Sequence, residues 1–236
     1  MFKTIVSILA VFILSTSLFA ENGDISKEAL LSKIVEAYGG EAALTRALGY
    51  IQHWRVIRSS DGVEGEETRR VTLPERLYVN LKYPDKEEAR VLEGDVGIKI
   101  FDKRVKKQAF GPMLDAMKLQ LLRIYNPLVL EKFSDRIEMV SQQNGYILKL
   151  SGNGVECDYY VDPKNFRIEK TVGKLKIGPT DMEFVTLYKD FTRYGSVLMP
   201  SKEIKYAGGV QTAVNKLLDM EFFTLKRVSD HRYERI

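Results

Sequence analysis

The sequence predicts a mainly β protein, in which one strongly curved antiparallel sheet of about eleven strands forms an open half-barrel. After Tyr50, apolar and polar residues alternate with a period of two over most of the chain, as in strands with one buried face. The connectors are short and rich in Gly, Asn, Asp and Pro, which is typical of antiparallel hairpins. A long twisted sheet does not stay flat, so we expect it to curl and to be closed by the two helical segments, one N-terminal and one mid-chain.

Composition and charge exclude several other classes of protein. The 236 residues are 44% hydrophobic and 29% charged, and the mean hydropathy is −0.20. These values exclude a disordered chain, a collagen-like chain and a membrane protein with several spans. The formal net charge of +4 is small, and the densest basic segment, Lys99–Lys107, is interleaved with apolar residues as in a strand. We therefore expect no nucleic-acid partner, because that function needs basic residues gathered on one face.

Residues 1–20 have the pattern of a secretory signal peptide. Lys3 supplies a positive charge, Thr4–Leu14 is apolar, and small residues lead up to Ala20. The apolar run is shorter than the roughly 20 residues needed to span a bilayer, so we expect cleavage after Ala20 rather than a retained anchor. Residues 21–236 show neither a linker nor an internal repeat, which predicts a single exported domain.

Two helices are expected directly after the signal. Ser26–Tyr38 places Leu30 and Ile34 on one apolar face, and Gly39–Gly40 supplies a C-terminal stop. A shorter helix over Glu41–Leu48 follows. The first half of the sheet then comes as hairpins, with strands over Tyr50–Arg58, Glu66–Leu73, Leu77–Tyr83, Glu88–Leu92 and Val96–Asp102.

The mid-chain segment Pro112–Phe133 has helical spacing, and Pro127 interrupts it. Its apolar stripe consists of Met113, Leu114, Met117, Leu121 and Ile124. One interpretation is that this stripe packs permanently into the core, as most such stripes do. The other is that the helix forms a movable lid, whose methionines adapt to varied apolar ligands.

The remaining strands resume the alternation of period two. They are predicted over Arg136–Val140, Tyr146–Leu150, Val155–Val161, Phe166–Val172, Glu183–Phe191, Val197–Tyr206 and Gln211–Leu225. The highly charged end of the chain, Arg227–Ile236, is expected to be frayed. A concave face lined by the large apolar residues of these strands predicts an apolar interior that holds a ligand. The expected cavity residues are Trp54, Val56, Leu77, Val79, Leu81, Tyr146, Leu148, Tyr159, Phe166, Ile168, Met220 and Phe222, with Val155 and Leu218 on the same face.

Signals for catalysis or metal binding are weak. The two histidines, His53 and His231, do not form a pair at metal-binding spacing, and motifs for a serine or cysteine nucleophile are absent from the sequence. Asp61–Glu67 lacks the spacing of a calcium loop and is interpreted as a hairpin turn. The single cysteine, Cys157, is expected to be a small buried side chain. We expect no enzyme activity, catalytic residue, metal or cofactor; His53 beside buried carboxylates in a cleft would reopen that question.

The order of these elements resembles the superfamily of periplasmic lipoprotein carriers, the LolA/LolB-like proteins. Gly65–Val79 resembles the strand, proline and strand passage of that family, and Leu92–Ala109 resembles its acidic-glycine turn, aromatic strand and second hairpin. Asp162–Ile168 resembles a hairpin late in its sheet, and Asp190–Tyr206 resembles the ending of its sorting-like members. The resemblance covers nearly all of the chain after the signal.

The resemblance implies a monomeric periplasmic carrier that holds a lipid, a lipoprotein acyl chain or another hydrophobic ligand, with a possible delivery partner at the inner or outer membrane. An alternative is a periplasmic sensor or scaffold module that binds a protein partner with the same fold. The carrier itself has an arginine immediately before the proline, where Leu73 stands here, and Arg69 and Arg70 lie earlier. This departure argues against dedicated lipoprotein sorting and favours a broader class of ligand.

Overall fold

The computed structural model describes residues 25–152, 154–178, 180–229 and 232–235, with the backbone alone from residue 226 onward. The expected signal peptide and its cleavage after Ala20 lie outside these residues. Thirteen strands form one open antiparallel sheet, with β6 (Val105–Ala109) at one edge and β7 (Ile137–Gln142) at the other. The predicted fold class is therefore confirmed, with two strands more than the approximate number expected.

The N-terminal half of the sheet is a series of hairpins. Its strands are β1 (Gly49–Arg58), β2 (Glu64–Thr72), β3 (Arg76–Tyr83), β4 (Lys86–Glu93), β5 (Val96–Phe101) and β6 (Val105–Ala109). The sequence pattern did not predict β6, because four of its five residues are exposed and it shows no alternation. Its lysines are typical of an edge strand, where charge discourages pairing with another chain.

The C-terminal half of the sheet is a second series of hairpins. It contains β7 (Ile137–Gln142), β8 (Gly145–Gly152), β9 (Val155–Val161), β10 (Ile168–Ile177), β11 (Thr180–Tyr194), β12 (Val197–Ala207) and β13 (Val210–Phe222). β13 pairs with β1 and so joins the two halves into one sheet. The expected frayed end is wrong, since β14 (Leu225–Ser229) and β15 (Arg232–Arg235) pair as a separate two-stranded sheet.

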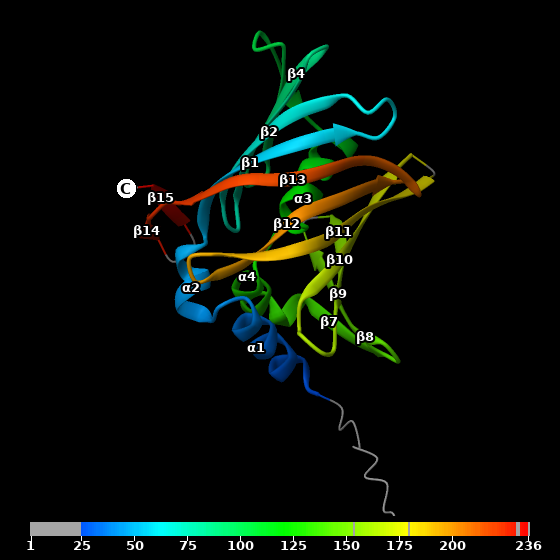
Figure 1. Ribbon diagram of the computed structural model, residues 1–236. Coiled ribbons are helices and arrows are strands. Elements are labelled where there is room, and N and C mark those ends of the chain that lie inside the picture. Colours follow the sequence, from blue (N-terminus) through cyan, green and yellow to red (C-terminus); the bar gives the residue numbers. More distant parts are fainter. Residues whose placement is uncertain (1–24, 153, 179, 230–231, 236) are drawn as a thin grey trace, which may run out of the picture.

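Three helices gather at one end of the half-barrel: α1 (Lys27–Ala37), α2 (Glu41–Arg46) and α4 (Pro127–Lys132) (Figure 1). Leu30 and Ile34 of α1 are fully buried, as their helical spacing predicted, and Leu44 and Leu130 join them in one core cluster. These side chains fill a large part of the hollow. Much of the expected apolar interior is therefore solid core.

The mid-chain helix α3 (Pro112–Leu122) lies in the hollow of the sheet and touches both halves, contacting β4 and β5 on one side and β9 and β10 on the other (Figure 1). Gly97 of β5 and Gly173 of β10 allow this close approach. A Cβ atom on Gly97 would lie 2.8 Å from a Leu114 methyl carbon, and one on Gly173 would lie 2.6 Å from a Leu119 methyl carbon. The helix thus packs directly against the sheet backbone at these two glycines, which have no side chain.

A β-bulge corrects one assignment of the sequence analysis. The register between β1 and β13 shifts after His53, which pairs with Asp219, so that Trp54 pairs with Leu217. Leu218 is the extra residue and its side chain is 56% exposed, whereas Leu217 packs against the core. The expectation that Leu218 faces the interior is wrong, because the alternation of period two does not continue through a bulge.

Candidate ligand-binding site

The interior of the half-barrel contains two cavities that matter for ligand binding. The first has a volume of about 60 Å³ and is largely apolar, with Tyr50, Trp54, Ile124, Tyr159 and Ile168 among its lining residues. The second has a volume of about 340 Å³, within the range of about 300–1,000 Å³ that is usual for small-molecule sites. Its apolar lining includes Val56, Leu81, Ala116, Leu119, Phe184 and Ala213.

The expected cavity residues divide between these cavities and the core. Trp54, Tyr159 and Ile168 line the first cavity, and Val56 and Leu81 line the second. The others pack in the hydrophobic clusters without lining either cavity; they are Leu77, Val79, Tyr146, Leu148, Phe166, Met220 and Phe222. Phe166 lies outside the strands, in the turn before β10, with a φ of 55°. Period-two alternation does not report which part of an inward face remains uncovered.

The expected lid residues are placed unequally. Met117 and Leu121 are buried against β-sheet residues such as Leu77 and Leu92, and Leu114 and Ile124 pack partly buried beside them. Met113, at the start of α3, is 40% exposed. Ile124 follows the helix and lines the first cavity.

The C-terminal end of α3 is anchored by two buried tyrosines. Tyr159 of β9 donates a hydrogen bond to the carbonyl oxygen of Leu122 at 2.6 Å, and Tyr188 of β11 donates to that of Arg123 at 2.7 Å. The last carbonyls of a helix have no partner within the helix, so these bonds satisfy groups that would otherwise be buried unpaired. Burial raises the pKa of both phenols well above 10, which keeps them protonated as donors. These bonds tie the C-terminal end of α3 to β9 and β11.

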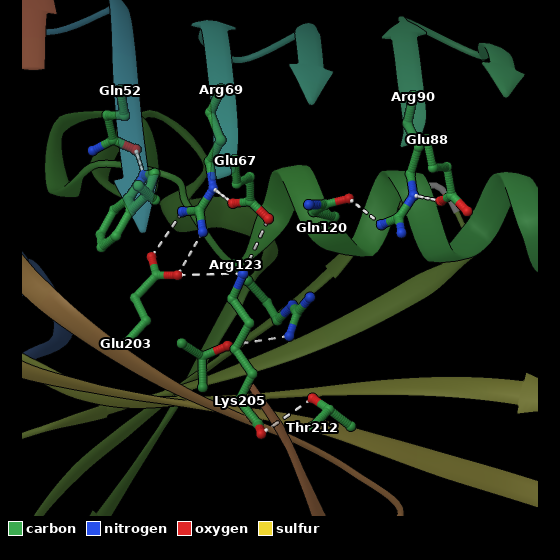
Figure 2. Close-up of polar contacts among 12 residues, drawn as sticks. Gln52, Glu67, Arg69, Glu88, Arg90, Gln120, Arg123, Glu203, Lys205 and Thr212 are labelled. Carbon is green, nitrogen blue, oxygen red and sulfur yellow. Dashed lines mark hydrogen bonds and ion pairs between the residues drawn. The ribbon is translucent and has the colours of Figure 1, made fainter. Parts of the chain in front are cut away.

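A buried network of charged side chains crosses the interior (Figure 2). Arg69 of β2 holds Glu203 of β12 with two hydrogen bonds of 2.8 and 2.6 Å, and it also donates to Glu67. The side chains of these three residues are between 3% and 6% exposed. Lys205 lies 3.6 Å from Glu67 and 3.5 Å from Glu203. The interior thus combines apolar side chains with a buried ionic network.

Neighbouring polar groups complete the network. With its oxygen turned toward the cations, the Asn215 amide accepts from Lys205 Nζ at 2.9 Å and from Arg69 Nη2 at 3.1 Å. The Arg69 guanidinium also lies over the Trp54 ring at 4.6 Å, and Trp54 donates to Gln52 at 3.2 Å. These contacts hold Trp54, the only tryptophan of the chain, between the first cavity and the network.

Neighbouring charges and burial together set the pKa values of the ionisable groups in this network. Burial by itself would raise the pKa of Glu203, but Arg69 and Lys205 outweigh it and lower that pKa to about 2. The pKa of Glu67 is lowered in the same way, against its burial, by Arg69 and Lys205. Burial and the Arg69 guanidinium lower the pKa of Lys205. Glu67 and Glu203 are therefore carboxylates at neutral pH.

The sequence patterns did not predict this network, although one local signal was present. Glu67 and Arg69 share the inward face of β2 with Val71, because residues two apart point to the same side. A charged residue in phase with buried apolar ones is a sign of a buried ion pair. Its partner, Glu203, lies 134 residues away from Arg69 in the chain, so no local pattern identified it.

The other candidate groups do not line the two cavities. His53 is exposed on the outer face of β1, where its ring contacts Thr68 at 3.2 Å, and His231 falls outside the described residues. Cys157 is buried, as expected, and burial raises its pKa to about 12. Within the described ranges, no group of three or more His, Cys, Asp or Glu side chains is placed to hold a metal ion. No helix in the described part of the chain is long and apolar enough to cross a membrane.

The seating of α3 on Gly173 leads to a testable prediction. Gly173→Ala is expected to lower the free energy of unfolding by about 1–3 kcal/mol, because the added methyl overpacks against the buried Leu119 side chain. Chemical denaturation measures this effect. In a Leu119→Ala background the same change should cost less, since the colliding atoms are gone. An equal cost in both backgrounds would show that the helix is not seated as described.

Comparison with known proteins identifies the fold. No protein-family model and no curated protein sequence matches the chain. A crystal structure of a LolA superfamily protein from Nitrosomonas europaea matches with a TM-score of 0.53 at 14% identity, over 86% of this chain and 96% of that one.

Two further solved structures match with lower TM-scores. One is a putative outer membrane lipoprotein-sorting protein domain from Vibrio parahaemolyticus, with a TM-score of 0.47 at 10% identity over 81% of this chain and 93% of that one. The other is a DUF1329 family protein from Desulfovibrio piger, with a TM-score of 0.49 at 8% identity over 83% and 92%. The open sheet, the helix that it encloses and the match to the Nitrosomonas europaea structure together show that the chain has the LolA-like fold.

Proposed function

We propose that the protein is a periplasmic carrier that binds a lipid, an acyl chain or another hydrophobic ligand inside the half-barrel. The observation that carries this proposal is the pair of interior cavities, one largely apolar around Trp54 and one of about 340 Å³ that is lined in part by α3 and has a partly apolar lining. The signal-like pattern of residues 1–20 supports export. Carriage of this kind requires neither a covalent step nor a cofactor.

Binding would be driven by burial of apolar surface, at about 0.8 kcal/mol for each methylene group removed from water. In the lid interpretation, α3 moves when a chain enters the interior. The exposed start of α3 and its tyrosine-anchored end fit a lid that opens at the N-terminal side. A monomer would suffice for binding, and release would use a delivery partner at the inner or outer membrane.

Trp54 offers a direct test, because it lines the first cavity and is the only tryptophan. Titration with a fatty acid below its micelle concentration is expected to shift the Trp54 emission and to saturate. Ala213→Phe, which fills the second cavity, should weaken this binding by about tenfold or more, since each lost methylene contact is worth a sizeable fraction of a tenfold change. Val214→Phe, on the opposite face of β13, is the matched control and should bind as the wild type does. Unsaturable or absent binding in the wild type would refute the carrier.

One observation favours the alternative of a module that binds a protein partner. Val96, Val105, Phe110 and Met113 are between 40% and 67% exposed. Val96 lies on β5, Val105 on β6 and Met113 at the start of α3, and Phe110 lies in the connector between β6 and α3. An exposed apolar group beside an edge strand is a common docking surface for another chain. A pull-down from envelope extract that recovers one stoichiometric protein, with no lipid bound, would favour this alternative.

A further inference from the structure

The charged lining of the second cavity is strongly unequal in sign. Its cationic side chains are Arg58, Lys86, Arg90, Arg123 and Lys205, and its only carboxylate is that of Glu67. A concave site lined by one sign of charge concentrates ligands of the opposite sign. The chemistry of this cavity therefore differs from that of the apolar cavity around Trp54.

Most of these cations are already engaged by acids. Arg58 pairs with Asp61 at 2.8 Å and with Asp85 at 3.0 Å. Arg90 pairs with Glu88 at 2.7 Å, as Figure 2 shows. Lys205 belongs to the buried network with Glu67 and Glu203. Lys86 is exposed at the rim, where it lies over the Tyr83 ring.

Arg123, at the inner end of the second cavity, differs from the cations that are paired with acids. Its Nη1 donates to the Thr186 hydroxyl at 3.2 Å, but no ion pair of Arg123 occurs among the described residues. Its Nε is buried and has no hydrogen-bond partner in the described part of the chain. Buried donors are almost always paired, and an unpaired one calls for a ligand or another partner.

The backbone holds Arg123 in position for a ligand. Arg123 follows the last residue of α3, and its carbonyl oxygen accepts the hydrogen bond from Tyr188 at 2.7 Å. Its side chain lines both cavities as well as a smaller space of about 20 Å³ that shares residues with each. Leu119 and Phe184 line the second cavity beside it. A cation is thus placed where an apolar chain would meet a polar head.

We propose that Arg123 binds the anionic group, a phosphate or carboxylate, of an amphiphilic ligand whose apolar chain occupies the interior. This inference rests on the proposed carrier function and specifies its class of ligand. A guanidinium presents its donors in one plane, in an arrangement that matches the oxygens of such anions. The unpaired Nε of Arg123 supplies one of these donors. The buried ionic network and the second cavity then have a common role as the head-group end of the site.

The test compares two ligands that differ only in the anion. Decanoylglycerol and decanoylglycerol phosphate share the same acyl chain, and calorimetry below their micelle concentrations measures both affinities. The wild type is expected to bind the phosphate about tenfold or more tightly than the neutral lipid, because hydrogen bonds between charged groups are roughly twice as strong as neutral ones. Arg123→Gln should lose this preference but still bind decanoylglycerol, and Arg123→Lys should keep part of it.

Arg104→Gln is the matched control, since Arg104 is exposed in the turn between β5 and β6 and lines none of the cavities described above. It should keep the full preference. Equal binding of both lipids by the wild type would overturn the anion site and leave the carrier standing. Absence of binding by either lipid would overturn both proposals. Inorganic phosphate alone, if it bound as tightly as the phospholipid, would overturn the amphiphile and show a site for a free anion.

Discussion

Arg69→Met is expected to lower the free energy of unfolding by about 3–5 kcal/mol, because it leaves the buried carboxylates of Glu67 and Glu203 without their main counter-charge. The two carboxylates would also repel each other, with Lys205 at 3.6 and 3.5 Å as the remaining ion-pair partner that the described residues provide. Methionine has a similar length and is apolar, so little packing volume is lost. Urea denaturation followed by circular dichroism measures the change.

Arg70→Met is the matched control for this experiment. Arg70 is the next residue of β2, but its side chain is exposed on the outer face of the sheet, where loss of one charge has a small effect. The double variant Arg69→Met/Glu203→Gln should be less destabilised than Arg69→Met alone, because Glu67 then balances Lys205. A double variant as unstable as the sum of its parts would contradict the charge-balance explanation.

Acid is expected to destabilise the protein through the same network. The pKa of Glu203 is about 2 in the folded protein, against an ordinary value of 4.5. A lowered pKa contributes stability that is fully present above pH 4.5 and is lost as the pH falls toward 2. The difference corresponds to about 3 kcal/mol of unfolding free energy. Because Glu67 and Glu203 interact, their titrations are coupled and the loss belongs to the pair.

Denaturation curves between pH 6 and pH 2 measure this dependence. Glu203→Gln should be less stable than the wild type at pH 6, and its stability should fall less steeply on acidification. Glu66→Gln, on the exposed face of β2 beside Glu67, should retain the wild-type profile. Parallel profiles for the wild type and Glu203→Gln would show that Glu203 does not hold its charge through Arg69.

The sequence predicted which side chains face inward, but not which of them border a cavity. The alternation of period two assigned Trp54, Val56 and Leu81 to the correct face, since backbone geometry alone sends alternate side chains to one side. Whether an inward side chain lines a cavity depends on what packs against it. Leu30 and Leu130 come from distant helices to cover much of the face, and nothing local to the strands indicates this.

The break in the mid-chain helix is a mixed case. Pro127 predicted an interruption, and the structure has α4 beginning at that residue with Asn126 as its N-cap. The sequence did not indicate that α3 ends at Leu122, or that the segment after it turns Arg123 into the interior. That ending depends on the hydroxyls of Tyr159 and Tyr188, which come from strands far along the chain.

The sequence by itself determined the fold class, the inward face of most strands and the apolar faces of the helices, because these follow from the local periodicity of the backbone. Only the tertiary structure decided that Arg69 meets Glu203 across the interior, that Leu218 leaves it through a bulge, and that Arg123 lies between two cavities. Arg69 and Glu203 are separated by 134 residues in the chain, and the bulge arises where β13 pairs with the distant β1. The geometry of these contacts is set by the packing of the whole sheet around α3, which no short segment of sequence encodes.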